Sequence, residues 1–207
     1  MDEHLTFNNH INIMNAKLKR ANNLLALSRH YLPSNLLKQI YYAQFHSHLS
    51  YGCQVWGQKS TFINKTVTLQ KKAVRLMAFA GRDTPTDPIF KNLKILKLND
   101  LITTNNIIFV HKTLNNLSPS HFKNFYELHN PNHNYDTSRN SNSVYTIPSG
   151  SVKIPNHEEG TLKQKCARDW NEILKILHRS NCHTERLLDV SILKLKNITK
   201  AHFIGAY

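Results

Sequence analysis

The hydrophobic residues at the start of the chain recur at the spacing of one helix face. They are three or four positions apart from residue 11 to residue 25, and a small serine continues the row. The stripe consists of Ile11, Met14, Leu18, Ala21, Leu25 and Ser28. Because a helix rarely continues past the residue before a proline, we expect this one to end before Pro33.

The next segment, residues 31–57, has a single charged residue, Lys38. Pro33 and Ser34 are typical of a helix start. The apolar residues follow at mixed three- and four-residue steps, which predicts a helix that is apolar on several sides and lies in the middle of a bundle. They are Leu36, Leu37, Ile40, Tyr41, Phe45 and Leu49.

A membrane span is the competing interpretation of this segment. Its many Gln, His and Ser residues argue against insertion into a bilayer, which tolerates few polar groups. The segment closes with Tyr51, Gly52, Trp56 and Gly57. We expect these aromatic residues to be core anchors at a helix end rather than ligand contacts.

Ser60 and Thr61 cap a third predicted helix, and Gly81 is a natural stop for it. Its expected inward stripe consists of Phe62, Thr66, Leu69, Ala73, Leu76 and Ala80. Residues 11–81 are therefore predicted to form a three-helix bundle around an apolar centre.

Helical patterns continue further along the chain. They cover residues 89–96, 100–116 and 121–128, a helix that starts after Gly160-Thr161, and residues 185–198. Residues 129–155 are rich in Asn, Ser and Pro, so we expect loops with two short extended pieces, Val144–Ile147 and Val152–Ile154. The predicted fold is mainly α, with this loop insertion in its second helical region.

The composition is that of a small globular protein. The 207 residues are 40% hydrophobic and the mean hydropathy is -0.46, which favours one or two small domains. The start, MDEHLTF, has no hydrophobic run, so no secretory signal is predicted. Cys53, Cys166 and Cys182 are widely spaced and odd in number, which suggests buried thiols in a reducing, intracellular compartment. Nucleus and cytoplasm are not distinguished.

The distribution of charge is more informative than its sum. The formal net charge is +14, and the span from His4 to Arg82 contains eleven Lys and Arg but no Asp or Glu. A solvated helix face normally mixes both signs. An AT-rich gene would explain abundant Lys, but it explains the missing acids less well. The pattern favours a polyanionic partner, most simply nucleic acid.

Two groups of bases are candidates for phosphate contacts. Lys65, Lys72 and Arg75 are spaced i, i+7 and i+10 on the third helix, which places them on one face, and Lys71 flanks them. On the first helix Lys17 and Arg20 are three apart, with Lys19 beside them. The predicted nucleic-acid-binding residues are Lys17, Lys19, Arg20, Lys65, Lys71, Lys72 and Arg75.

No catalytic residue, metal site, cofactor or small-molecule substrate is predicted. Polymerisation with two metal ions needs clustered carboxylates, and the adjacent acids are Asp2-Glu3 and Glu158-Glu159 alone. A glycine-rich phosphate loop is missing. His129, His133 and Asp136 resemble a weak HNH-like nuclease cluster that Pro131 interrupts, and an Asn-rich surface loop is the preferred interpretation. His178, Cys182 and His183 lack the second ligand pair of a zinc site.

Three phrases of the sequence together resemble one family. HLTFNNHI with a Lys-bearing helix is followed by YLPSNLLKQIYYAQFHSHLSYGCQVWG and then by LQKKAVRLMAFAG. This order resembles the region after the palm in the reverse transcriptases of jockey-like non-LTR (LINE-type) retrotransposons. The matching positions are His10-Ile11, Ser47, Leu49, Tyr51-Gly52, Trp56-Gly57, Gln70-Lys71 and Arg75, whereas Phe7 stands where the family often has Trp.

Later segments follow the family's order as well. PIFKNLKILKLND, FVHKTLNNLSP and Thr137-Ser138-Arg139 are similar to its next elements. Trp170-Asn171 resembles a W-N-x-L-P element, but the proline is absent here, since Leu174-Lys175 follows. The resemblance covers nearly the whole chain.

The resemblance implies a non-catalytic C-terminal fragment of an RNA-directed DNA polymerase, with palm and endonuclease outside this chain. A thumb-like basic bundle (1–82) would bind an RNA or DNA template–primer duplex. A helical extension (83–128), a loop region (129–160) and C-terminal helices (161–207) would follow. The alternative is a truncated transposon remnant that acts only as a small helical interaction protein, or has no function. An isolated nuclease is a third, less favoured hypothesis.

Overall fold

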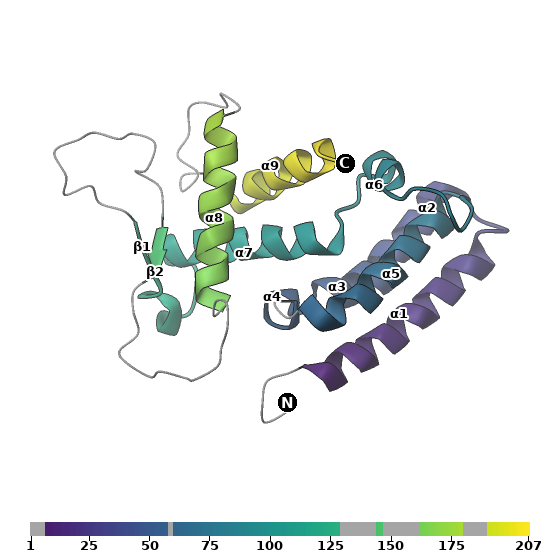
Figure 1. Cartoon of the computed structure of the whole chain (residues 1–207), viewed down its shortest axis with the longest axis horizontal. Helices are drawn as coiled ribbons and strands as arrows, with labels where there is room; N and C mark the ends of the chain where they lie inside the picture. The colour runs from purple at the N-terminus through teal and green to yellow at the C-terminus, as the bar shows by residue number, and fades with distance from the viewer. Residues whose placement is uncertain (1–6, 58–59, 129–143, 147–161, 180–189) are drawn as a thin grey trace. The chain divides into compact units, whose positions relative to one another are not determined.

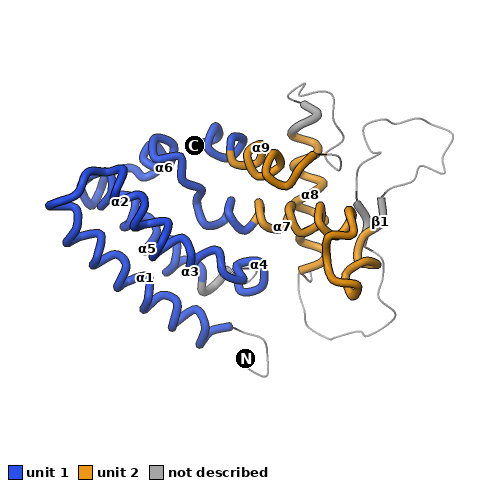
Figure 2. The backbone as a smooth tube through the Cα atoms, turned by 180° about the vertical axis from the view of Figure 1, so that it is seen from behind, with its two compact units in different colours: residues 1–102, 201–207 blue, residues 103–200 orange. Residues whose placement is uncertain are grey.

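The computed structural model describes residues 7–57, 60–128, 144–146, 162–179 and 190–207. It is mainly helical (Figure 1), which confirms the predicted fold class. The chain divides into two compact units (Figure 2). Unit 1 comprises residues 1–102 together with 201–207, and unit 2 comprises residues 103–200.

Unit 1 begins with α1 (Asn8–Ser28). Its predicted stripe is confirmed, because every member from Ile11 to Leu25 is buried and Ser28 is half-buried. The helix ends at Ser28, whose carbonyl accepts the backbone N–H groups of Tyr31 and Leu32 in the following turn. The apolar period of the sequence therefore predicted the buried face of this helix, and Pro33 predicted that it ends before that residue.

The second segment is one continuous helical stretch with a wide turn in its middle. It comprises α2 (Ser34–Ile40), a π-helical part (Tyr41–His46) and α3 (Ser47–Ser50). Its buried residues are four apart: Leu37, Tyr41, Phe45 and Leu49. In a regular α-helix such a row would turn by about 40° at each step. The wider π turn reduces this drift and keeps the row on one side.

The segment does not bury all of its apolar sides. Leu36 is exposed, whereas Ile40 is half-buried and packs against the core beside the main row. The bilayer alternative finds no support in the described residues either, since none of their helices is long and apolar enough to cross a membrane.

A short helix, α4 (Cys53–Trp56), follows a turn in which Gly52 takes a left-handed conformation with φ 59°. Trp56 is 2% exposed, as expected of a core anchor, and its Nε1 donates a hydrogen bond to the carbonyl of Tyr51 at 2.8 Å. Tyr51 itself does not fit the prediction, because 74% of it is exposed. Gly57 lies in the core against Ile102, where a β-carbon would not fit.

The third helix, α5 (Ser60–Met77), buries a different face from the predicted one. Thr66 and Ala73 are buried as expected, but Leu69 and Leu76 are only half-buried. The remaining buried positions are Ile63, Gln70, Val74 and Met77. The helix is thus rotated so that Leu69 and Leu76 lie at the border of the core. It also ends before Gly81, near Phe79, which has a positive φ of 55°.

These segments form the body of unit 1. Helices α1 and α5 run side by side in the same direction (Figures 1 and 2). The α2–α3 segment runs in the opposite direction and leads from the end of α1 back toward the start of α5. Helix α6 (Asp87–Leu93) and the first turn of α7 (Leu98–Leu114) complete the same core. Phe90, Ile95 and Leu98 contribute its fully enclosed side chains there.

Unit 2 contains the rest of α7, a 3-10 turn (Ser120–Phe122), α8 (Leu162–Arg179) and most of α9 (Ile192–Gly205). Strands β1 (Tyr126–Leu128) and β2 (Val144–Thr146) pair antiparallel, with Tyr126 opposite Thr146. Its core includes Ile107, Val110, Trp170 and Leu195, all fully buried.

Two predicted elements in this half need correction. Residues 126–128 form a strand rather than the end of a helix, because they pair with β2. The last described helix begins at Ile192 and includes the HFI part of the supposed tail, while residues 185–189 of the predicted helix lie outside the described residues. The extended piece at Val144–Ile147 corresponds to β2, whereas Val152–Ile154 lies outside the described residues.

The compact units follow packing, whereas the predicted segments follow composition. Unit 1 includes residues 83–102, which the sequence analysis placed in a helical extension. Most of the predicted loop region, 129–160, lies outside the described residues. The division into segments 1–82, 83–128, 129–160 and 161–207 stays a prediction.

Candidate nucleic-acid interface

An open groove of about 380 Å³ runs between α1 and α5 in unit 1. Lys19 lines it from α1 and Lys65 from α5. Both lysines are exposed. The other lining residues are small or polar for the most part: Asn12, Asn15, Ala16, Thr68 and Leu69. The structure therefore brings together one base from each of the two predicted groups.

Buried polar contacts beside the groove hold the two helices in register. The hydroxyl of Thr66 donates to Oδ1 of Asn15 at 2.8 Å. The amide of Asn22 donates to the backbone carbonyl of Leu69 at 3.0 Å. All three polar side chains are buried, so breaking either contact would leave a polar group without water or partner. The groove consequently has fixed walls.

Lys72 continues the row of Lys65 along α5. A separation of seven residues brings a helix back to within about 20° of the same direction, some 10 Å further along its axis. Lys72 is exposed, like Lys65. Leu69, which lies between the two lysines in the sequence, lines the groove, whereas Lys72 itself does not. We call Lys19 and Lys65, which line the groove, together with Lys72, which follows Lys65 on the same side of α5, the groove lysines.

The other predicted bases point elsewhere. Lys17 and Lys19 are two residues apart on α1, which separates their directions by about 200°. Lys17, Arg20 and Lys71 are exposed but do not line the groove. Arg75 is half-buried, and its Nε donates to the backbone carbonyl of Thr84 at 2.9 Å. Arg75 therefore stabilises the turn after α5.

None of the predicted bases forms an ion pair with a described residue. Lys97, which is not one of them, forms an ion pair with Asp87 at 3.0 Å. The span from His4 to Arg82, which includes α1 and α5, contains no Asp or Glu. The bases of α1 and α5 therefore have no acidic partner on either of these two helices.

Gln70, which the sequence matched to a family motif, is a buried structural residue. Its Nε2 donates to the hydroxyl of Tyr41 at 3.0 Å and to the carbonyl of Leu96 at 2.9 Å. Its Oε1 accepts the backbone N–H of Leu98 at 2.9 Å. Burial raises the pKa of Tyr41, so its hydroxyl remains protonated. Gln70 joins α5 to the central segment and to the start of α7.

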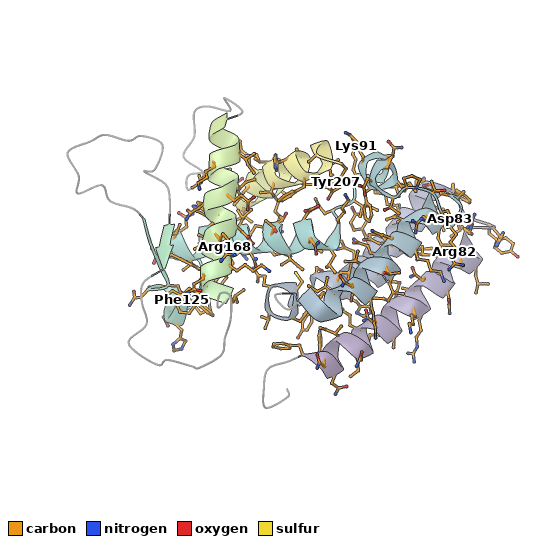
Figure 3. The ribbon with its side chains drawn as sticks, viewed as in Figure 1. Arg82, Asp83, Lys91, Phe125, Arg168 and Tyr207 are labelled. Carbon is orange, nitrogen blue, oxygen red and sulfur yellow. The ribbon has the colours of Figure 1, made fainter. Side chains whose placement is uncertain are left out.

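Sequence reasoning missed a second set of contacts in unit 1, around Tyr207. Its hydroxyl donates to the carboxylate of Asp100 and accepts the backbone N–H of Lys97 at 3.0 Å. Lys91 Nζ donates to the backbone carbonyl of Tyr207 at 3.2 Å (Figure 3). Burial raises the pKa of the Asp100 carboxyl. No local pattern could have shown these contacts, because they join residues more than a hundred positions apart.

The other chemistry-bearing residues form no site in the described part of the chain. No group of three His, Cys, Asp or Glu side chains there could hold a metal ion. Cys53 and Cys166 are buried thiols, and burial raises the pKa of Cys166 to about 12. Cys182, His129, His133, Asp136 and His183 lie outside the described residues.

We compared the chain with protein-family models, with curated proteins and with solved structures, and none of them matches. The resemblance to retrotransposon reverse transcriptases thus stays a prediction that rests on the sequence phrases.

Proposed function

We propose that unit 1 binds the template–primer duplex of RNA or DNA through phosphate contacts. In this proposal the chain is a non-catalytic, C-terminal part of a retrotransposon reverse transcriptase. One observation carries it: Lys19 and Lys65, on two helices far apart in the sequence, line one groove in a region without acidic residues.

The chemistry of a nucleic-acid backbone suits this arrangement. Each phosphate carries a negative charge that exposed lysines can neutralise, releasing condensed counterions. Such contacts position a duplex and carry no sequence information. The groove lysines project from helices that Asn15, Thr66 and Asn22 hold together, so they are presented on a rigid surface. A rigid surface loses less conformational entropy on binding than a flexible tail does.

The resemblance supports the same interpretation from another direction. In the phrase that contains Gln70, Lys71 and Arg75, the buried Gln70 fixes the helix while the lysines around it face solvent. A helix held in this way can act as a support for phosphate contacts. The proposal assigns that role to α5, with Lys65 and Lys72 on the contacting edge.

The salt dependence of duplex binding tests the proposal. We expect the logarithm of affinity for a labelled hairpin duplex to fall with the logarithm of salt, by about 0.9 for each phosphate contact. Changing Lys19, Lys65 and Lys72 together to Gln should reduce the slope by roughly two to three units. Fluorescence anisotropy across a salt series gives both slopes. Affinity should not depend on the duplex sequence.

A matched control removes the same charge from unit 2. Lys112, Lys123 and Lys196 are exposed there, and their joint change to Gln should leave the slope near that of the parent. Equal, small effects of both triple variants would mean that the bases only keep the protein soluble. That result would overturn the proposal and favour the alternative of a small helical interaction protein.

The non-catalytic part of the proposal has its own test. Polymerisation by two metal ions needs several carboxylates at one place. We expect no primer extension by the purified chain with a primer–template and Mg²⁺, beyond that of a buffer control. Extension in this assay would show that the chain carries catalytic groups that the proposal does not assign.

A further inference from the structure

A second groove, of about 440 Å³, lies at the other side of α1 in unit 1. It is formed by the first turns of α1 and by the turn between α3 and α4. Aromatic and aliphatic side chains line most of it: Phe7, His10, Ile13, Tyr51, Val55 and Trp56. We call it the aromatic groove. Its size falls in the range of small-ligand pockets.

The aromatic groove has a fixed wall and an exposed ring. Trp56 is held in the core, and its Nε1 donates to the carbonyl of Tyr51. Tyr51 is thereby anchored through its backbone, while its side chain is 74% exposed. The ring of His10 lies 6.5 Å from that of Tyr51 and 6.4 Å from that of Trp56. The three rings therefore lie close together along the groove, and Tyr51 exposes most of its side chain to solvent.

The charges next to the aromatic groove select its ligand. His10, Ile13 and Lys17 are spaced i, i+3 and i+7 on α1, so they lie on one side of that helix. Lys17 stands one turn beyond Ile13, and Arg20 follows it. Both are exposed, and the span from His4 to Arg82 contains no acid. A purely apolar partner would leave these cations unused, whereas a polyanion with flat rings would use both features.

We infer that the aromatic groove holds an unpaired base of a nucleic-acid strand, which stacks on Tyr51 and His10. The phosphates that flank this base contact Lys17 and Arg20. This inference rests on the proposed function, and it gives a role to the bases that do not line the α1–α5 groove. Stacking on aromatic side chains is the usual means of holding bases without sequence preference.

The test compares two strands of equal charge. One is a labelled thymine oligonucleotide, and the other has the same length and phosphates but abasic sugars. We expect the parent protein to bind the thymine strand about 5- to 150-fold more tightly. Tyr51→Ala should lower the affinity for the thymine strand to the level of the abasic strand. The affinity for the abasic strand should stay as in the parent. Tyr51→Phe, which keeps the ring, should retain the preference.

Further variants serve as controls. Tyr31, 87% exposed and outside the aromatic groove, provides the matched control Tyr31→Ala, which should behave like the parent. Changing Lys17 and Arg20 together to Gln should weaken binding of both strands alike and preserve their ratio. Circular-dichroism melts of each variant confirm that it is folded; the backbone carbonyl that accepts the Trp56 hydrogen bond remains in Tyr51→Ala.

Equal binding of the two strands by the parent would overturn the inference, as would a loss of both strands in Tyr51→Ala. If the groove instead binds a helix of a partner protein, the parent should bind the two strands equally. If the duplex still binds with its full salt slope, only the aromatic-groove inference fails. If neither strand nor the duplex binds at low salt, the proposed function fails with it.

Discussion

The side-chain amide of Gln70 donates a hydrogen bond to the hydroxyl of Tyr41, with 3.0 Å between Nε2 and Oη. Gln70 lies on α5 and Tyr41 at the start of the π-helical part, and both are almost fully buried. The same amide also bonds the backbone of Leu96 and Leu98. Each hydrogen-bonding atom of this side chain is therefore used, which orients α5 and the lysines on its outer edge.

Replacing Gln70 by Leu should destabilise unit 1 strongly. The apolar side chain has a similar size but leaves buried groups of Tyr41, Leu96 and Leu98 without partners, at about 1–3 kcal/mol each. Urea unfolding measures the change in the free energy of unfolding. Gln44→Leu, at an exposed position, is the matched control and should stay within about 0.5 kcal/mol of the parent. Similar values for the two variants would contradict the assigned role of Gln70.

Replacing Trp56 by Ala should lower the free energy of unfolding by about 3–5 kcal/mol. The indole ring is 2% exposed and its loss would leave a large cavity. The neighbouring change Val55→Ala, at a residue with 45% exposure, should cost far less. Thermal melts of both variants make the comparison, and an unchanged midpoint for Trp56→Ala would show that the ring is not a core anchor.

Gly57→Ala and Gly205→Ala should have opposite effects. A β-carbon on Gly57 would lie 2.3 Å from the carbonyl oxygen of Cys53 and 2.6 Å from Cδ1 of Ile102, which predicts overpacking of about 1–3 kcal/mol. A β-carbon on Gly205 meets nothing within 4 Å, so the loss of chain entropy in the unfolded state should dominate. We expect Gly205→Ala to be neutral or to gain up to about 1 kcal/mol. Urea unfolding gives the free energy of unfolding of both variants. A Gly57→Ala variant as stable as the parent would contradict the predicted overpacking.

Asp169 should make the stability of the protein depend on pH. Burial raises the pKa of its carboxyl in the folded state, although the hydrogen bond that it accepts from Asn106 at 2.7 Å lowers it in part. The folded state therefore keeps this proton to a higher pH than the unfolded state does. Its contribution to stability is fully present below about pH 4 and falls as the pH rises through the raised pKa.

The variant Asp169→Asn lacks this titration, so its stability relative to the parent should increase as the pH rises from about 4 to 7. Urea midpoints across that range provide the measurement. A constant difference between Asp169→Asn and the parent would show that the carboxyl ionises alike in both states.

The local pattern of the sequence determined the helical class and most helix positions. The stripe from Ile11 to Leu25 predicted the buried face of α1 correctly, since apolar residues on one helix face have no other place than the core. The acid-free span predicted a positive surface charge on this part of the chain. The sign of this charge depends on composition alone and needs no tertiary structure. These properties need no knowledge of which helix lies beside which.

Only the tertiary structure decided which residues share a site. The rotation of α5 depends on the hydrogen bonds of Gln70 and on contacts with α1, and it moved Leu69 and Leu76 to the border of the core. That rotation places Lys65 with Lys19 at the groove. Helical spacing gives the angle between two residues of one helix, but not the direction in which the helix faces its neighbours. The groove lysines therefore became visible only once α1 and α5 were packed together.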